Sequence, residues 1–246
     1  MQNNELRYVH TDNIHNFKAA TIVVPFLLSL LKPGSVADVG CGTGTWLKVF
    51  GDQGISDLLG VDGAYVDKEK LHIAKSNFKE YDLETPYRPE KRYDLVISLE
   101  VAEHLKESSA NIFVKTLTEI SDTVVFSAAI PNQGGQNHIN EQPPQYWIEK
   151  FEKLGYTCHD VLRPVFWENP QIDWWYRQNM LLLTKNAEIS DRLLAMSSFS
   201  GTHLVHPSVL KMRQNAVNRL KGIMEGKKGI RMYAELLFKA ISNKFR

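Results

Sequence analysis

A glycine-rich turn between a short apolar strand and a helix constrains this chain more than any other feature of its sequence. The strand is predicted over Ser35-Val-Ala-Asp-Val39, and Gly40-Cys-Gly-Thr-Gly44 and a helix over 45–52 follow it directly. Glycines allow a tight turn and close approach of a ligand, and a helix N-terminus presents N–H groups to anions. The spacing is G-x-G-x-G, which differs from the G-x-G-x-x-G of dinucleotide-binding turns. We therefore expect a ligand-binding turn in an α/β sheet, with a plain tight turn as the alternative.

Strands and helices alternate along the first three quarters of the chain. Strands are predicted over 35–39, 57–61, 77–81, 93–99, 123–130, 156–162 and 179–184, and helices over 13–31, 45–52, 108–120 and 145–154. Such alternation predicts a doubly wound α/β sheet with right-handed crossovers. Ligands of these sheets lie at the carboxyl ends of the strands. Asp38, Asp62, Asp82 and Glu100 all fall at or near such ends, and Asp62 is placed to accept two ribose hydroxyls.

Four segments together resemble the class I S-adenosylmethionine-dependent methyltransferases. They are Val36-Ala-Asp-Val-Gly-Cys-Gly-Thr-Gly44, Asp62, Tyr81-Asp-Leu83 and Tyr93-Asp-Leu-Val-Ile-Ser-Leu-Glu-Val-Ala-Glu-His-Leu105. The resemblance spans about residues 35–185. It implies a Rossmann-like fold with seven mostly parallel strands, the last antiparallel, and S-adenosylmethionine as the cofactor.

The resemblance also implies which residues hold that cofactor. Asp38 and the glycine turn would hold its methionine end, Asp62 its ribose and Asp82 its adenine amino group. The full set implied for cofactor binding is Asp38, Gly40, Cys41, Gly42, Gly44, Asp62, Gly63, Asp82, Leu83 and Leu99.

A second group of polar residues follows the fourth and fifth predicted strands. If 100–104 begins a helical turn, Glu100, Glu103 and His104 share one face, and His138 comes from the next loop to meet them. Two carboxylates and two imidazoles suit a divalent metal, Mg or Mn, that polarises an acceptor hydroxyl. The pattern resembles metal-assisted O-methyltransferases. Two alternatives stay open: His138 acts as the catalytic base without a metal, or the acids only cap a helix.

The acceptor is predicted from the loop over 131–144 and from an aromatic segment. Trp174-Trp175-Tyr176-Arg177-Gln178-Asn179 offers aromatic faces beside amides, which suit a sugar ring or a nucleic-acid base, or simply close the core. With His138, Asn140, Gln142 and Trp147, these residues resemble methyltransferases of bacterial glycan assembly. The resemblance implies O-methylation of a sugar or glycan hydroxyl. RNA ribose, small-molecule hydroxyls and a non-catalytic cofactor-binding protein are the alternatives.

Charge separates the chain into two parts. The total is 29 Lys and Arg against 28 Asp and Glu, but residues 210–246 hold ten basic and two acidic residues, a net +8. The first 209 residues then carry a net −7. We expect a catalytic domain over 1–185 and a basic helical extension over 186–246, with helices at 207–224 and 230–241. The extension could pack on the domain, form a homodimer contact or attach peripherally to anionic lipid, which would suit a lipid-linked glycan acceptor.

Composition limits the remaining possibilities. Only Cys41 and Cys158 are present, so no disulfide framework is expected. We expect the protein to function in a reducing compartment. The longest apolar stretch, 19–31, is too short to span a bilayer and contains Pro25. These features predict a cytoplasmic protein, with the basic tail at the inner membrane face as one option. Nucleic acid is a less favoured partner because the body is acidic and carries no RNA-binding motif.

Overall fold

The computed structural model describes residues 17–196 and 204–244. Contacts divide the chain into two units, Met1–Leu204 and Val205–Arg246. The first residues of the helix expected over 13–31 lie outside the described residues.

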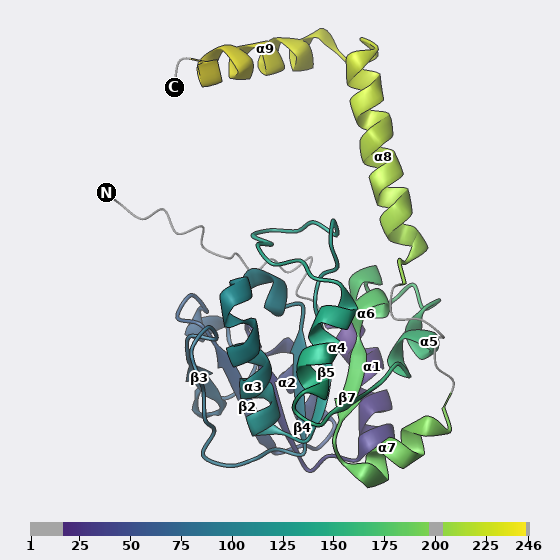
Figure 1. Ribbon diagram of the computed structural model, residues 1–246. Coiled ribbons are helices and arrows are strands. Elements are labelled where there is room, and N and C mark those ends of the chain that lie inside the picture. The colour runs from purple at the N-terminus through teal and green to yellow at the C-terminus, as the bar shows by residue number, and fades with distance from the viewer. Residues whose placement is uncertain (1–16, 197–203, 245–246) are drawn as a thin grey trace. The chain divides into compact units, whose positions relative to one another are not determined.

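A seven-stranded sheet forms the centre of the first unit (Figure 1). Its order is β3-β2-β1-β4-β5-β7-β6. The strands are β1 (Ser35–Val39), β2 (Asp57–Asp62), β3 (Phe78–Glu80), β4 (Leu95–Leu99), β5 (Thr123–Ser127), β6 (Thr157–His159) and β7 (Leu181–Thr184). The first five strands pair in parallel and β7 runs antiparallel to both neighbours, which confirms the predicted doubly wound, mostly parallel sheet. The order reverses between β1 and β4, the position where such sheets bind ligands.

Helices cover both faces of the sheet. The apolar sides of α1 (Lys18–Leu31), α2 (Thr45–Asp52) and α5 (Leu162–Phe166) form one core, in which Leu27 and Phe50 are fully buried. The other core contains α3 (Ala110–Ile120) and α4 (Pro144–Glu152), with Phe113 and Phe151 fully buried. β1, β4 and β5 are buried along their whole length, since both of their faces are covered.

The structure differs from the sequence prediction mainly after residue 159. β6 ends at His159, and α5 then begins at Leu162, where a strand to 162 was expected. Helices α6 (Trp174–Asn179) and α7 (Ala187–Leu194) were not predicted. Because α7 packs on β6 and β7, the compact first unit continues past the expected boundary at 185 to Leu204.

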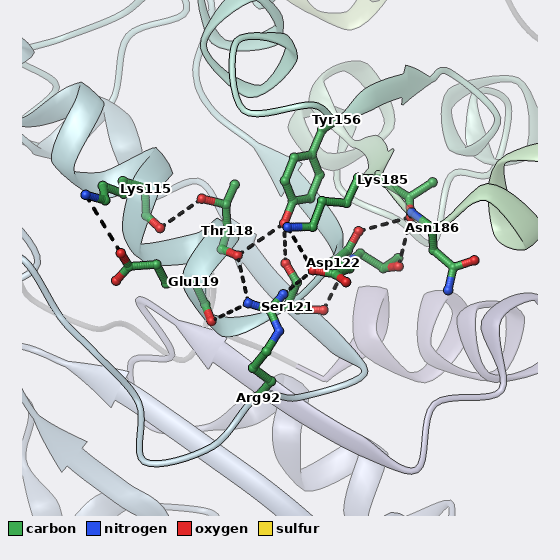
Figure 2. Close-up of polar contacts among 11 residues, drawn as sticks. Arg92, Lys115, Thr118, Glu119, Ser121, Asp122, Tyr156, Lys185 and Asn186 are labelled. Atoms are coloured by element: carbon green, nitrogen blue, oxygen red, sulfur yellow. Dashed lines mark hydrogen bonds and ion pairs between the residues drawn. The ribbon is translucent and has the colours of Figure 1, made fainter.

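A polar cluster closes the amino-terminal edge of the sheet (Figure 2). Asp122 precedes β5 and pairs with Arg92 and, at 3.1 Å, with Lys185. The buried Tyr156 hydroxyl donates to the carbonyl oxygens of Thr118 and Ser121, and burial raises its pKa to about 12. Each charge of this cluster therefore has a partner of opposite sign.

The second unit consists of α8 (Pro207–Met224) and α9 (Ile230–Lys244), joined by a turn at Gly226. Both helices were predicted from the sequence, and α9 extends three residues beyond its expected end. The Tyr233 hydroxyl donates to the Ile223 carbonyl oxygen at 2.7 Å and so ties the start of α9 to the end of α8. Among the described residues, no helix combines the length and apolar character needed to cross a bilayer.

Candidate functional site

The glycine turn lies between β1 and α2, at the carboxyl edge of the sheet. Gly40, Gly42 and Gly44 all have positive φ, and Gly44 immediately precedes α2. A Cβ atom on Gly40 would lie 2.3 Å from the Val101 side chain. The turn therefore packs directly on the segment that follows β4, which carries the second polar group.

Asp62, the last residue of β2, is hydrogen-bonded to this turn. Its Oδ2 accepts the Gly42 N–H at 2.6 Å, and its Oδ1 accepts the Gly63 N–H at 2.7 Å and the Tyr65 hydroxyl. Only 2% of Asp62 is exposed, whereas 41% of Tyr65 is. A ribose hydroxyl that bound Oδ1 would take the position that the Tyr65 hydroxyl holds here.

Asp38 is the second buried acid of this region. Within the described residues, its Oδ2 has no hydrogen-bond partner. Burial, and then the charge of Asp62, raise the pKa of Asp38 well above its ordinary value of 3.8. A buried carboxylate without a cation is unstable on its own, so this position fits a ligand that brings a positive charge.

The other predicted cofactor residues lie around the same edge in different surroundings. Cys41 is buried, with a pKa raised by burial and then by the charge of Asp38. Asp82 is exposed and accepts the Glu84 N–H at 2.9 Å, so it caps its own turn. Leu83 and Leu99 are buried and Gly63 is half-buried.

A second cluster joins two loops at this edge. Glu103 and His104 lie in a 3-10 turn (Ala102–His104) after β4, and His138 lies in the loop after β5. One ligand atom from each of these three residues lies within 4.8 Å of the other two. The two imidazole rings meet edge to face, with centroids 4.9 Å apart. The predicted meeting of the two loops is therefore present.

Glu103 is fully buried, and neither of its carboxylate oxygens completes a hydrogen bond with a described residue. Burial, and then the neighbouring Glu100, raise the pKa of Glu103 well above its ordinary value of 4.5. The backbone of Glu103 and Ala129 approaches the carboxylate without a completed hydrogen bond and offsets only part of this rise. Like Asp38, this carboxylate would be stabilised by a cation.

Glu100 is placed differently from the prediction. It was expected to share a helical face with Glu103 and His104 as a fourth metal ligand, but its φ is +56° and it lies before the 3-10 turn. Its carboxylate accepts hydrogen bonds from the Gln133 and Asn179 amides, each at 3.0 Å. The left-handed backbone turns the side chain toward these amides, and so Glu100 is not part of the three-residue cluster.

His138 is held by its own loop. Its Nδ1 lies 2.9 Å from Glu141 Oε1, which also accepts the Gly134 N–H at 2.6 Å. Burial opposes ionisation of Glu141, but the bonds from His138 and Gly134 outweigh it and lower its pKa. A Cβ atom on Gly135 would lie 2.1 Å from His138 Nε2, so only glycine leaves room for the ring.

A family model described as a methyltransferase domain matches residues 13–178. The chain belongs to this methyltransferase family. No protein with a curated description matches the chain.

A solved structure shows the same fold, and a second one is similar in part. The methyltransferase domain of a bacterial protein, CtHen1-C, is 22% identical; the match covers 70% of this chain and all of that chain, with a TM-score of 0.50. Magnesium protoporphyrin IX methyltransferase from Synechocystis PCC 6803, solved with bound SAM, is 18% identical over 70% of this chain and 81% of that chain, with a TM-score of 0.48.

The aromatic segment of the methyltransferase contributes to the site only in part. Trp174 and Trp175 are half-buried with ring centroids 5.5 Å apart, and the Tyr176 ring lies 5.4 Å from Trp46 of α2. Arg177 donates to the Trp167 carbonyl oxygen at 2.9 Å, so its side chain bonds to the chain that precedes this segment.

Trp147 was grouped with the acceptor residues in the sequence prediction. In the structure it is a core residue of the methyltransferase, 2% exposed and packed on Phe126.

Three residues of the site were not singled out from the sequence. Glu141 orients His138, and its signal was the His-x-x-Glu spacing. Gly135 makes room for the ring, and Gln133 joins the Glu100 carboxylate to Asn179 at 2.9 Å. No local pattern marks Gln133, because its role depends on contacts with Glu100 and Asn179 from separate segments. Gly135 acts within its own loop, on a ring three residues further along.

Proposed function

We propose that this methyltransferase uses S-adenosylmethionine to methylate a hydroxyl group of a sugar or glycan conjugate. The observation that carries the proposal is His138, held by Glu141 next to Glu103 and His104, which follow the Val101 side chain that packs against the glycine turn. A hydroxyl acceptor must lose its proton, whereas an amine or thiolate needs no such base. A held imidazole beside a cofactor turn meets that need.

The residues around the glycine turn fit the cofactor. Asp38 would pair with the ammonium of its methionine end, which gives the unpartnered Oδ2 its missing positive charge. Asp62 would accept the ribose hydroxyls, with Gly63 beside it, and Asp82 and Leu83 would contact the adenine. When bound, the cofactor supplies a methyl group on a sulfonium, and alignment with the acceptor accounts for most of the rate.

His138 would take the proton of the acceptor hydroxyl. Its Nδ1 faces the Glu141 carboxylate, which favours the tautomer with the proton on Nδ1 and leaves Nε2 free to accept. Glu141 would also stabilise the imidazolium that results. General-base catalysis of this kind contributes about 10²- to 10⁴-fold.

A divalent cation would be held by Glu103, His104 and His138. Support comes from the ligand atoms within 4.8 Å and from a buried Glu103 carboxylate that completes no hydrogen bond among the described residues. The carboxylate suits Mg or Mn and the two imidazoles favour Mn over Mg, and either cation would lower the pKa of a nearby acceptor hydroxyl. A metal on His138 Nε2 would leave that ring no lone pair for the acceptor proton, so His138 would be the base only where no metal is bound.

The sugar acceptor is supported by the side chains next to the cluster. Gln133, Gln178 and Asn179 form a hydrogen-bonded amide group beside Glu100, and the half-buried Trp174 and Trp175 follow one another on α6. These amides are buried and hold the Glu100 carboxylate in place, and the aromatic faces can stack on the C–H surface of a sugar ring.

The test is transfer of labelled methyl from S-adenosylmethionine to separated glycan, lipid, RNA and small-molecule fractions. We expect label in the glycan or glycolipid fraction, in an ether that yields an O-methyl sugar on acid hydrolysis. His138→Ala should abolish the label, whereas His159→Ala, a buried histidine bonded to Ser190, should not. Label confined to RNA or to small molecules would contradict the sugar proposal. Activity that survives exhaustive chelation would contradict the proposal that a metal takes part.

A further inference from the structure

The second unit presents an extended apolar surface that the proposed reaction does not use. In α8 and α9, Val209 is the one buried residue among those described. Large apolar side chains are exposed on both helices: Leu210, Met212, Val217, Leu220, Met224, Ile230, Leu236, Leu237, Phe238 and Ile241. Monomeric soluble proteins rarely expose apolar side chains in such a group, so the surface marks an interaction site.

The exposed side chains of α9 gather on one face. At 100° per residue, the apolar side contains Ile230, Tyr233, Ala234, Leu236, Leu237, Phe238, Ala240 and Ile241, with Lys244 at its C-terminal end. The opposite side contains Arg231, Met232, Glu235, Lys239, Ser242 and Asn243. Phe238 is 75% exposed and Ile230 is 88% exposed, so no described residue of the second unit covers this apolar face. The helix is therefore amphipathic with its apolar half open.

The same unit is strongly basic. Residues 210–246 hold ten Lys and Arg against Glu225 and Glu235. These two acids pair with Lys227 and Arg231, which leaves basic side chains in large excess. An occupant of this surface must therefore be apolar and negatively charged at once.

We propose that α8 and α9 bind the surface of an anionic lipid bilayer. A basic amphipathic helix lies in the interface, with its apolar face between the acyl chains and its cations near the anionic headgroups. Neither described helix is suited to cross the bilayer, which agrees with binding parallel to its surface. The apolar side chains of this surface thus match the acyl chains of a bilayer, and its positive charge matches the anionic headgroups.

Two other occupants fit the charges or the apolar face, but not both. A second copy would bring its own net +8 against the first, and like charges oppose such a contact. The first unit has the opposite net charge, but its exposed large apolar residues come from separate elements: Phe17, Tyr65, Ile139, Leu154, Val165 and Leu194.

The experiment is co-sedimentation of the full chain with vesicles of phosphatidylcholine alone or mixed with phosphatidylglycerol. We expect binding to the mixed vesicles at low salt and a large loss at high salt. Phe238→Ser should weaken binding about tenfold or more, since its ring leaves the apolar layer. Lys239→Gln should weaken it about fivefold. Ser242→Ala, on the polar side of α9, should stay within about twofold.

Circular dichroism and methyl transfer to a soluble acceptor check that each variant keeps its helices and its reaction. Equal binding to neutral and anionic vesicles, or no binding to either, would overturn the proposal. So would unchanged vesicle binding of Phe238→Ser. Self-association in analytical ultracentrifugation that Phe238→Ser abolishes, without vesicle binding by the natural chain, would assign the surface to a second copy instead.

Discussion

The two edges of the sheet use the same residue types in opposite ways. At the amino-terminal edge, the Asp122 carboxylate faces two cations, and the Tyr156 hydroxyl bonds to two carbonyl oxygens (Figure 2). At the carboxyl edge, Asp38 and Glu103 are more deeply buried, yet each has a carboxylate oxygen without a hydrogen-bond partner among the described residues.

This difference separates structure from function. A paired charge at the half-exposed amino-terminal edge holds the strands together and needs nothing further. An unpaired buried carboxylate lowers the stability of the free protein and is explained by a ligand that supplies the missing charge. Substitutions at the two edges should therefore change different measurements.

The largest effect is expected at the carboxyl edge. Glu103→Gln removes a charge from the three-residue cluster, and we expect kcat/KM to fall about 10²- to 10⁴-fold, as for loss of a metal ligand or of the base it supports. The free energy of unfolding should stay the same or rise, because an unpaired buried charge is gone. Steady-state methyl transfer and thermal unfolding of the same samples test both parts. A Glu103→Gln variant that is less stable to unfolding but keeps its kcat/KM would mean that Glu103 has a structural role rather than a functional one.

Asp38→Asn should weaken S-adenosylmethionine binding by roughly 10- to 100-fold, since a hydrogen bond to a charged group is lost. In the natural chain the pKa of Asp38 lies above its ordinary 3.8, and the cofactor ammonium favours the ionised form. Cofactor affinity should therefore rise with pH up to the pKa of Asp38 in the free protein and level off above it. Calorimetric titration across pH measures this slope. The Asn variant should lack it; a slope that persists there would assign it to another group.

At the amino-terminal edge, Tyr156→Phe should lower stability and leave the reaction intact. It removes the hydroxyl bonds to Thr118 and Ser121, which we expect to cost about 1–2 kcal/mol of unfolding free energy. For a protein of this size that corresponds to a fall in Tm of roughly 2–8 °C. Scanning calorimetry gives the shift. A loss of kcat at temperatures where the variant is folded would contradict the separation of the two edges.

The smallest effect is expected from Tyr65→Phe, and it is a gain. In the free protein the Tyr65 hydroxyl donates to Asp62 Oδ1, the atom proposed to accept a ribose hydroxyl. Without this competitor, cofactor affinity should rise about two- to fivefold. Calorimetry at one pH is sufficient to measure it. Weaker binding would mean that Tyr65 holds Asp62 in its binding orientation.

Local sequence patterns predicted the longer regular helices and strands of the fold. Glycine and strand signals placed β1 and α2 at their observed bounds, and apolar periodicity placed α8 at its observed bounds. The secondary structure after β6 was harder to predict from the sequence, because α5 and α6 contain only five and six residues. Helices so short have little periodicity, and their stability comes from packing against the sheet.

The site could be predicted by residue type but not by arrangement. Glu103, His104 and His138 were expected together and lie together, since the topology places β4 and β5 side by side. Glu100 was assigned to the same helical face, and the sequence contains no signal for its left-handed φ of +56°. The carboxylate follows that backbone turn to Gln133 and Asn179, two residues distant in sequence.

One main-chain contact at the site bears on how its specificity can change. The Glu103 carbonyl oxygen accepts the N–H groups of Ile139 and Asn140, at 2.9 and 3.0 Å, just after His138. The position of His138 along the loop is thus fixed by backbone atoms that every residue except proline possesses. The side chains of Pro131 and Gln136 can be exchanged without moving that anchor, whereas Asn132 and Asn137 have φ of +66° and +58° and should be limited to Asn or Gly. Libraries restricted to these positions should yield enzymes with new acceptors and an unchanged proton-transfer group.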